Sequence, residues 1–253
     1  MAFHLSAVSI PLGSFTLSVH PLFESLAYFT GYRIYRRQRR LAGDFLSSAD
    51  RLWIVTAAIA GAAVGSKVLG WFEHPMETLA HWNDPLFLLG GKTIVGAFLG
   101  GTALVEWTKL RLGIHRRTGD LFAIQLALGT AVGRIGCLLA GLDDRTYGTP
   151  STLPWAVDFG DGIPRHPTQA YEILFLLALT PLLYWFDRRP HREGDNYRMF
   201  LISYCAWRLV IDFIKPDPRW FGLSTIQWAC VLALIWYSRD LARILFRRPL
   251  TNG

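Results

Sequence analysis

The chain has 253 residues, of which 51% are hydrophobic and 18% are charged, and its formal net charge is +7. Soluble domains carry about 25% charged residues, so this composition indicates a membrane protein. The three cysteines are scattered through apolar runs and fit neither a disulfide framework nor a zinc motif. Most of the basic residues lie between apolar runs rather than in one patch, so we expect no nucleic-acid partner. We also expect no bound metal and no cofactor.

Apolar runs long enough to cross a bilayer recur along the chain. Basic clusters follow the first, third, fifth and seventh runs, whereas few basic residues follow the others. By the positive-inside rule, this predicts an N-terminus outside and a C-terminus in the cytoplasm. We therefore predict an all-α integral membrane protein, a single polytopic domain over 1–253 with an extracytoplasmic loop at about 142–167. The seven predicted transmembrane helices are 16–32, 52–72, 86–106, 120–141, 168–186, 199–214 and 221–238.

The third run contains the stretch LLGGKTIVGAFLGG, in which Lys92 and Thr93 follow Gly90 and Gly91. This stretch is not a phosphate loop, because Leu86 stands where that motif needs its first glycine. We expect the glycines of this stretch to let helices approach closely, as small residues four apart on a helix do. Lys92 lies near the outer end of the run, where it either extends to the interface or faces a lipid phosphate.

Two arginines lie within predicted spans. Arg134 is in the fourth and Arg208 in the sixth, at matched depth about 10 Å below the outer surface. A charge at the bilayer centre costs at least ~2.5–3.5 kcal/mol on insertion scales, so such residues usually face the protein interior. Asp212 lies four residues after Arg208 and predicts a pair on one helix face, which is either a simple salt bridge or a device that aims the guanidinium. Because guanidinium binds phosphate well, we favour a phospholipid headgroup as the ligand.

The loop between the fourth and fifth runs is rich in Gly, Pro, Asp and aromatic residues, and its length suggests a lid or binding surface. His166 precedes Pro167 near its end, before a helix that carries Glu172. His166 either forms local hydrogen bonds or serves as a general base or headgroup contact.

Three stretches in this order, AVGRIGCLLAG, RHPTQAYE and YCAWRLVIDF, resemble the bacterial prolipoprotein diacylglyceryl transferases, as does the early HPLFESLAYFTGY segment. The resemblance covers most of the chain. It implies an enzyme of the bacterial plasma (inner) membrane that transfers diacylglyceryl from phosphatidylglycerol to the lipobox cysteine of a prolipoprotein and releases glycerol 1-phosphate.

The resemblance also implies site residues. The two essential arginines match Arg134 and Arg208, and the acidic residue after the second one matches Asp212. The remaining matches, which we expect to contact substrate, are Tyr204, Gly148, Arg165, Tyr171 and Glu172, with His166 and Gln169 in the same motif.

The chain is a divergent member by this comparison. Cys137 and Ala140 stand where the family usually has asparagines, and Leu142 replaces a glutamate. Many members have His-Gly-Gly on the third span, where this chain has Leu89, Gly90 and Gly91. His166 is then the best remaining candidate for the base, with Lys92 second and Gly91 beside it as a substrate contact.

Three functions remain open from the sequence. The first is the family reaction, with phosphatidylglycerol or a related anionic phospholipid and a prolipoprotein signal peptide as partners. The second is a related headgroup or glycerolipid transferase with a different acceptor. The third is a membrane protein that binds phospholipid without turnover.

Overall fold

The computed structural model describes residues 3–5, 7–12, 15–42 and 46–246. The chain divides into two compact units. Unit 1 comprises residues 1–43, 118–200 and 214–216, and unit 2 comprises 44–117, 201–213 and 217–253. Arg134 therefore belongs to unit 1 and Arg208 to unit 2.

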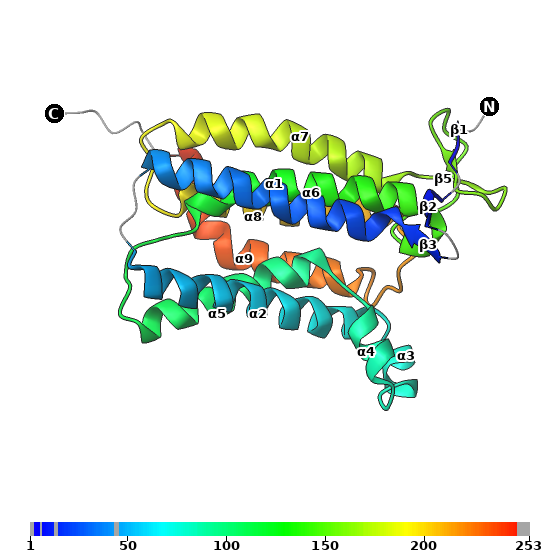
Figure 1. Ribbon diagram of the computed structural model, residues 1–253, viewed down its shortest axis with the longest axis horizontal. Coiled ribbons are helices and arrows are strands. Elements are labelled where there is room, and N and C mark those ends of the chain that lie inside the picture. The colour runs from blue at the N-terminus through cyan, green and yellow to red at the C-terminus, as the bar shows by residue number, and fades with distance from the viewer. Residues whose placement is uncertain (1–2, 6, 13–14, 43–45, 247–253) are drawn as a thin grey trace. The chain divides into compact units, whose positions relative to one another are not determined.

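Unit 1 is built on the helices α1 (Val19–Ala42), α6 (Asp120–Ala140) and α7 (Thr168–Asp187), followed by the start of α8 (Asp195–Ile211). α6 packs against both α1 and α7 (Figure 1). The contact with α1 requires a glycine at position 136, because a Cβ there would lie 2.6 Å from the Phe23 Cβ and 3.4 Å from the His20 carbonyl oxygen. This close approach brings the start of α1 against the last turns of α6.

The described chain is mostly helical, as predicted, and short strands that the all-α prediction did not include accompany the helices. β1 (Phe3–His4) pairs in parallel with β4 (Val157–Asp158), β4 pairs antiparallel with β5 (Pro164–Arg165), and β2 (Ser9–Leu12) forms a hairpin with β3 (Phe15–Ser18). The predicted loop at 142–167 thus contains two strands, preceded by the 3₁₀ turn η1 (Gly141–Asp144). The Asp158 carboxylate accepts hydrogen bonds from the backbone N–H groups of Gly160 and Gly162, which closes the turn between β4 and β5.

Unit 2 contains α2 (Ser48–Glu73), α3 (Pro75–Ala80), α4 (Pro85–Gly90), α5 (Ile94–Arg111), α9 (Thr225–Phe246), the end of α8 and most of η2 (Asp212–Ile214). α2 and α5 lie side by side (Figure 1). Their backbones touch, since a Cβ on Gly65 would lie 2.3 Å from the Gly96 carbonyl oxygen. The prediction that glycines of the third run allow close helix packing is thus confirmed at Gly96, whereas a Cβ on Gly90 or Gly91 would meet open space.

The predicted span 86–106 is interrupted in the structure. Thr93 separates α4 from α5, because its hydroxyl accepts from the Gly96 N–H and its own N–H donates to the Ser66 hydroxyl at 3.0 Å. Each of the other six predicted spans overlaps one long helix. Three segments of the described chain combine the length and hydropathy needed to cross a membrane, namely Ser48–Glu73, Asp120–Asp144 and Thr168–Asp187.

Candidate functional site

Arg134 lies in unit 1 on α6 and is 5% exposed. Its Nε atom lies 2.9 Å from the Glu172 Oε2 atom on α7, and its Nη1 atom lies 3.8 Å from the Cys137 Sγ atom. Glu172 is buried as well. The arginine therefore enters the helix bundle together with a carboxylate that neutralises it, and Glu172, expected as a substrate contact, is the partner of Arg134.

Arg208 and Asp212 form the corresponding buried pair in unit 2. The Arg208 Nε and Nη2 atoms donate to the two Asp212 carboxylate oxygens at 3.0 and 3.1 Å. This is the i, i+4 pair that the sequence spacing predicts, in the bidentate arrangement. Tyr204, one turn earlier, is fully buried against Phe98, with the ring centroids 5.1 Å apart.

The two pairs share one electrostatic design. A buried guanidinium without a counter-charge is costly, and a carboxylate on one edge offsets that cost. Guanidinium carries five N–H donors in a fixed fork, a geometry that matches the oxygens of carboxylates and phosphates. Each unit thus contains one arginine that is fixed in place and suited to an anion.

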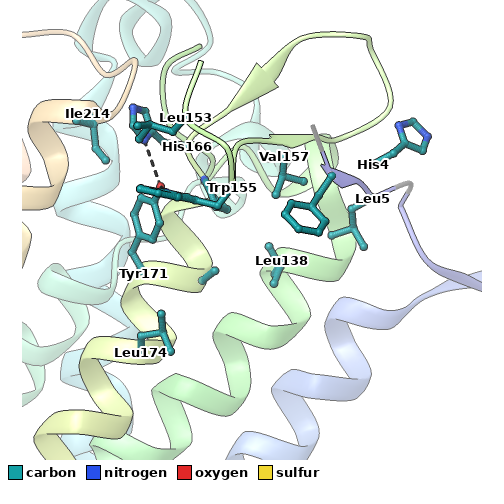
Figure 2. Close-up of a pocket in the computed structure, with 13 residues that line it drawn as sticks. His4, Leu5, Leu138, Leu153, Trp155, Val157, His166, Tyr171, Leu174 and Ile214 are labelled. Atoms are coloured by element: carbon teal, nitrogen blue, oxygen red, sulfur yellow. Dashed lines mark hydrogen bonds between the residues drawn. The ribbon is translucent and has the colours of Figure 1, made fainter. Parts of the chain in front are cut away.

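His166 and Tyr171 border an apolar cavity of about 800 Å³ in unit 1 (Figure 2). The His166 Nδ1 atom and the Tyr171 hydroxyl are 3.3 Å apart, and the Trp155 indole N–H donates to the same hydroxyl at 2.8 Å. The apolar walls come from α6, α7, the 145–167 segment, the N-terminal segment and the last residue of η2, and they include Leu138, Leu153, Val157, Leu174 and Ile214. The Nδ1 atom of His166 faces a neutral hydroxyl rather than a carboxylate.

Gly148 and Arg165 organise the segment beside this cavity. A Cβ on Gly148 would lie 2.7 Å from the His166 Cβ and 2.8 Å from the Ile214 carbonyl oxygen, so only glycine fits there. The Arg165 guanidinium binds both Asp161 carboxylate oxygens at 2.7 Å, and this hydrogen bonding lowers the pKa of Asp161 to about 2. Arg165, expected as a substrate contact, is thus engaged within the β4–β5 turn.

Lys92 and Gly91 lie at the break between α4 and α5 in unit 2, where both are exposed. The sequence analysis did not assign a role to Lys67 on α2. Its ammonium donates to the carbonyl oxygens of Leu89, Gly90 and Gly91, the last two at 3.1 Å. Lys67 therefore satisfies carbonyls at the C-terminal end of α4, which a cation stabilises. Its presence inside an apolar run was the only signal in the sequence.

A second group in unit 1 was also missed. One ring nitrogen of His20, the Cys137 Sγ atom and one Asp144 carboxylate oxygen lie within 4.8 Å of one another. Nitrogen, sulfur and oxygen donors of this kind could hold Zn²⁺. However, the Arg134 guanidinium lies 3.8 Å from the thiol, and its positive charge opposes a bound cation. His20 and Asp144 are far apart in sequence, so no spacing rule could have found them.

Comparison with known proteins gives a consistent result. The sequence model of the family described as prolipoprotein diacylglyceryl transferase matches residues 7–238. A phosphatidylglycerol–prolipoprotein diacylglyceryl transferase of Bordetella avium is 32% identical over 235 residues, covering 87% of this chain and 88% of the relative. Proteins of the same name from Bordetella bronchiseptica (30% identical, 90% of both chains) and Nitrosospira multiformis (31% identical, 96% of this chain and 90% of the relative) are similar too.

Proposed function

This chain belongs to the prolipoprotein diacylglyceryl transferase family, and we propose that it transfers the diacylglyceryl group of phosphatidylglycerol to the lipobox cysteine thiol of a prolipoprotein. The sulfur attacks the glycerol carbon that bears the phosphate, the C–O bond breaks, and glycerol 1-phosphate leaves. No nucleophile on the enzyme is needed for this reaction, because the acceptor thiol supplies it.

The observation that carries the proposal, beside the family, is the buried arginine in each unit. Negative charge grows on the phosphate as it leaves, and fixed cations in a poorly solvated site stabilise that charge. We assign Arg134 and Arg208 to the phosphate, with Glu172 and Asp212 holding their guanidinium groups in place. Both carboxylates are almost fully buried, which fixes the position of each cation before substrate arrives.

The remaining site residues receive supporting roles in this proposal. The cavity beside His166 and Tyr171 has a volume typical of small-ligand sites and apolar walls, which suit an apolar part of a substrate. Gly148 allows the close packing of the adjoining segment, and Tyr204 packs against Phe98 one helical turn before Arg208. Other proposed substrate contacts are Lys92, Gly91 and Arg165.

The membrane topology is also part of the proposal. Seven spans, with the N-terminus outside and the C-terminus in the cytoplasm, account for the distribution of basic clusters. Seven helices of at least 17 residues occur in the described part of the chain, and each overlaps one of the apolar runs, which supports this proposal. We place the protein in the inner membrane of a bacterium. The 145–167 segment beside the cavity and the outer ends of α6 and α7 would then face translocated prolipoproteins.

A reconstituted assay tests this function. Purified protein is mixed with phosphatidylglycerol vesicles and a lipobox peptide, and both glycerol phosphate release and peptide lipidation are measured. Arg134→Ala and Arg208→Ala should each slow release by about 10²–10³-fold, since each removes a donor to the developing charge. Arg243→Ala, which removes an arginine paired with Asp240 elsewhere, is the matched control.

The outcome separates the three functions. Release together with peptide lipidation supports the family reaction. Release without lipidation favours a different acceptor. Lipid binding without any release favours a protein that binds phospholipid only, and it contradicts the transferase proposal.

A further inference from the structure

His20 and Asp144 form a histidine–carboxylate pair in unit 1 that the proposed reaction has not yet used. His20 lies in the first turn of α1, and Asp144 ends η1 directly after α6. The His20 Nδ1 atom is 3.2 Å from the Asp144 Oδ1 atom. A carboxylate at this distance favours one orientation of the imidazole ring.

The Asp144 carboxylate is held in place from its other side. Its Oδ2 atom accepts a hydrogen bond from the Thr146 hydroxyl, and the Thr146 carbonyl oxygen accepts one from the Thr168 hydroxyl at the start of α7. The Asp144 side chain is 11% exposed, whereas that of His20 is 32% exposed. The carboxylate is therefore covered and fixed, while part of the imidazole remains open to an incoming group.

The pair lies close to the arginine assigned to the phosphate. The Cys137 Sγ atom is within 4.8 Å of the pair, and the Arg134 Nη1 atom is 3.8 Å from that sulfur. The imidazole of His20 and the guanidinium of Arg134 therefore both lie near the Cys137 thiol. A base at this position would stand beside an acceptor thiol that approaches a phosphate on Arg134.

Groups from several elements lie close to His20. The neighbouring element α6 contributes Gly136 and the Cys137 thiol, and the Ser18 hydroxyl at the end of β3 accepts from the His20 backbone N–H at 3.3 Å. The titratable and charged groups that face the ring or lie next to it are Asp144, Cys137, Arg134 with its partner Glu172, and Glu24 one turn along α1.

We propose that His20, oriented by Asp144, takes the proton from the acceptor thiol. This inference rests on the proposed function. The S–H proton moves to the Nε2 atom of His20, because Nδ1 faces the carboxylate, and the sulfur electron pair forms the new C–S bond. The C–O electron pair leaves with the glycerol phosphate, and the imidazolium then returns its proton to that product or to water. In this scheme His20 is the catalytic base and Asp144 is a positioning residue.

The test compares His20→Gln with two other histidine variants, His166→Gln and the exposed His115→Gln, which is the matched control. The glycerol phosphate assay is run from pH 6 to pH 10 with lipobox peptides that carry either cysteine or selenocysteine. We expect His20→Gln to lower kcat about 10²–10⁴-fold at neutral pH. The loss should shrink as pH rises and should largely disappear with selenocysteine, because a selenol ionises without help. Binding of phosphatidylglycerol and the melting temperature should match those of the wild type.

Asp144→Asn provides the second variant. It should show the same dependence on pH and selenium with a smaller loss, because the imidazole remains. If His20→Gln loses activity equally at every pH and with both peptides, the role of His20 is structural and the proposal is wrong. Equal activity of His20→Gln and wild type, or rescue by selenium in His166→Gln alone, would also overturn it. Activity that requires added Zn²⁺ and is abolished by chelators would instead make the cluster a metal site.

The proposed function can fail separately. If the wild type releases no glycerol phosphate, the transferase proposal falls and this one falls with it. If the wild type is active and His20→Gln keeps its rate, only the assignment of the base is refuted.

Discussion

Replacement of Glu172 by glutamine should markedly lower the melting temperature of the protein. The substitution keeps the shape of the side chain but leaves the Arg134 guanidinium buried beside a neutral amide. At the 2.9 Å separation of Nε and Oε2 and an effective dielectric constant of about 20, the lost attraction is about 6 kcal/mol. Some of this is offset by relaxation, and breaking a buried pair typically costs about 3–5 kcal/mol.

Thermal unfolding in detergent measures this cost. For a chain of this size, 3–5 kcal/mol corresponds to a melting temperature lower by about 6–20 °C. Asp240→Asn, which breaks the partly exposed pair with Arg243, should change stability by less than about 1 kcal/mol. The double variant Arg134→Met with Glu172→Leu should be more stable than Glu172→Gln alone, since it leaves no buried charge at this contact between α6 and α7. An unchanged melting temperature in Glu172→Gln, or a double variant that is less stable still, would refute this account of the pair.

Three further outcomes follow from contacts elsewhere. Gly65→Ala should lower the stability of the protein by about 1–3 kcal/mol in thermal unfolding, because the added Cβ would lie 2.3 Å from a carbonyl oxygen of α5. Gly90→Ala should have almost no effect on stability, because a Cβ there meets open space. The hydrogen bond that the His191 ring donates to the Asp120 carboxylate has the largest influence on the pKa of His191 and raises it to about 9. This pair should therefore stabilise the protein fully below pH 6.5 and lose that contribution as pH rises through 9. A melting curve of His191→Gln that keeps the same pH dependence would contradict this. Lys67→Met should cost about 1–3 kcal/mol and speed hydrogen exchange in the last turn of α4, which hydrogen–deuterium exchange would detect.

Local spacing predicted some parts of the site and not others. The pair of Arg208 and Asp212 follows from their four-residue separation on one helix, so it could be predicted. The pair of Arg134 and Glu172 joins two helices, and nothing in the sequence states which side chains meet across that contact. His20 and Asp144 meet for a similar reason, since only the glycine at position 136 lets α1 approach the end of α6.

The interrupted third span shows another limit of sequence patterns. Hydropathy is continuous from 86 to 106, and an average over such a run contains no information on where the backbone hydrogen bonds change partners. The break depends on one threonine hydroxyl and on Ser66 of α2, a contact between separate helices. The carbonyls to which Lys67 donates lack partners within a helix only because α4 ends there. The outer strands were missed because each is two to four residues long, too short for a periodic signal.

The glycine contact between α2 and α5 has a mechanical consequence. With backbones in direct contact at Gly61, Gly65, Gly96 and Gly100, no side chains lie between the helices there to rotate out of the way. The two helices should therefore move together as one rigid body, and no space is left between them for a lipid chain at the level of these glycines. Any gap through which a phospholipid enters unit 2 sideways from the bilayer must open along another helix border, and spin labels placed across α2 and α5 should report a constant separation throughout turnover.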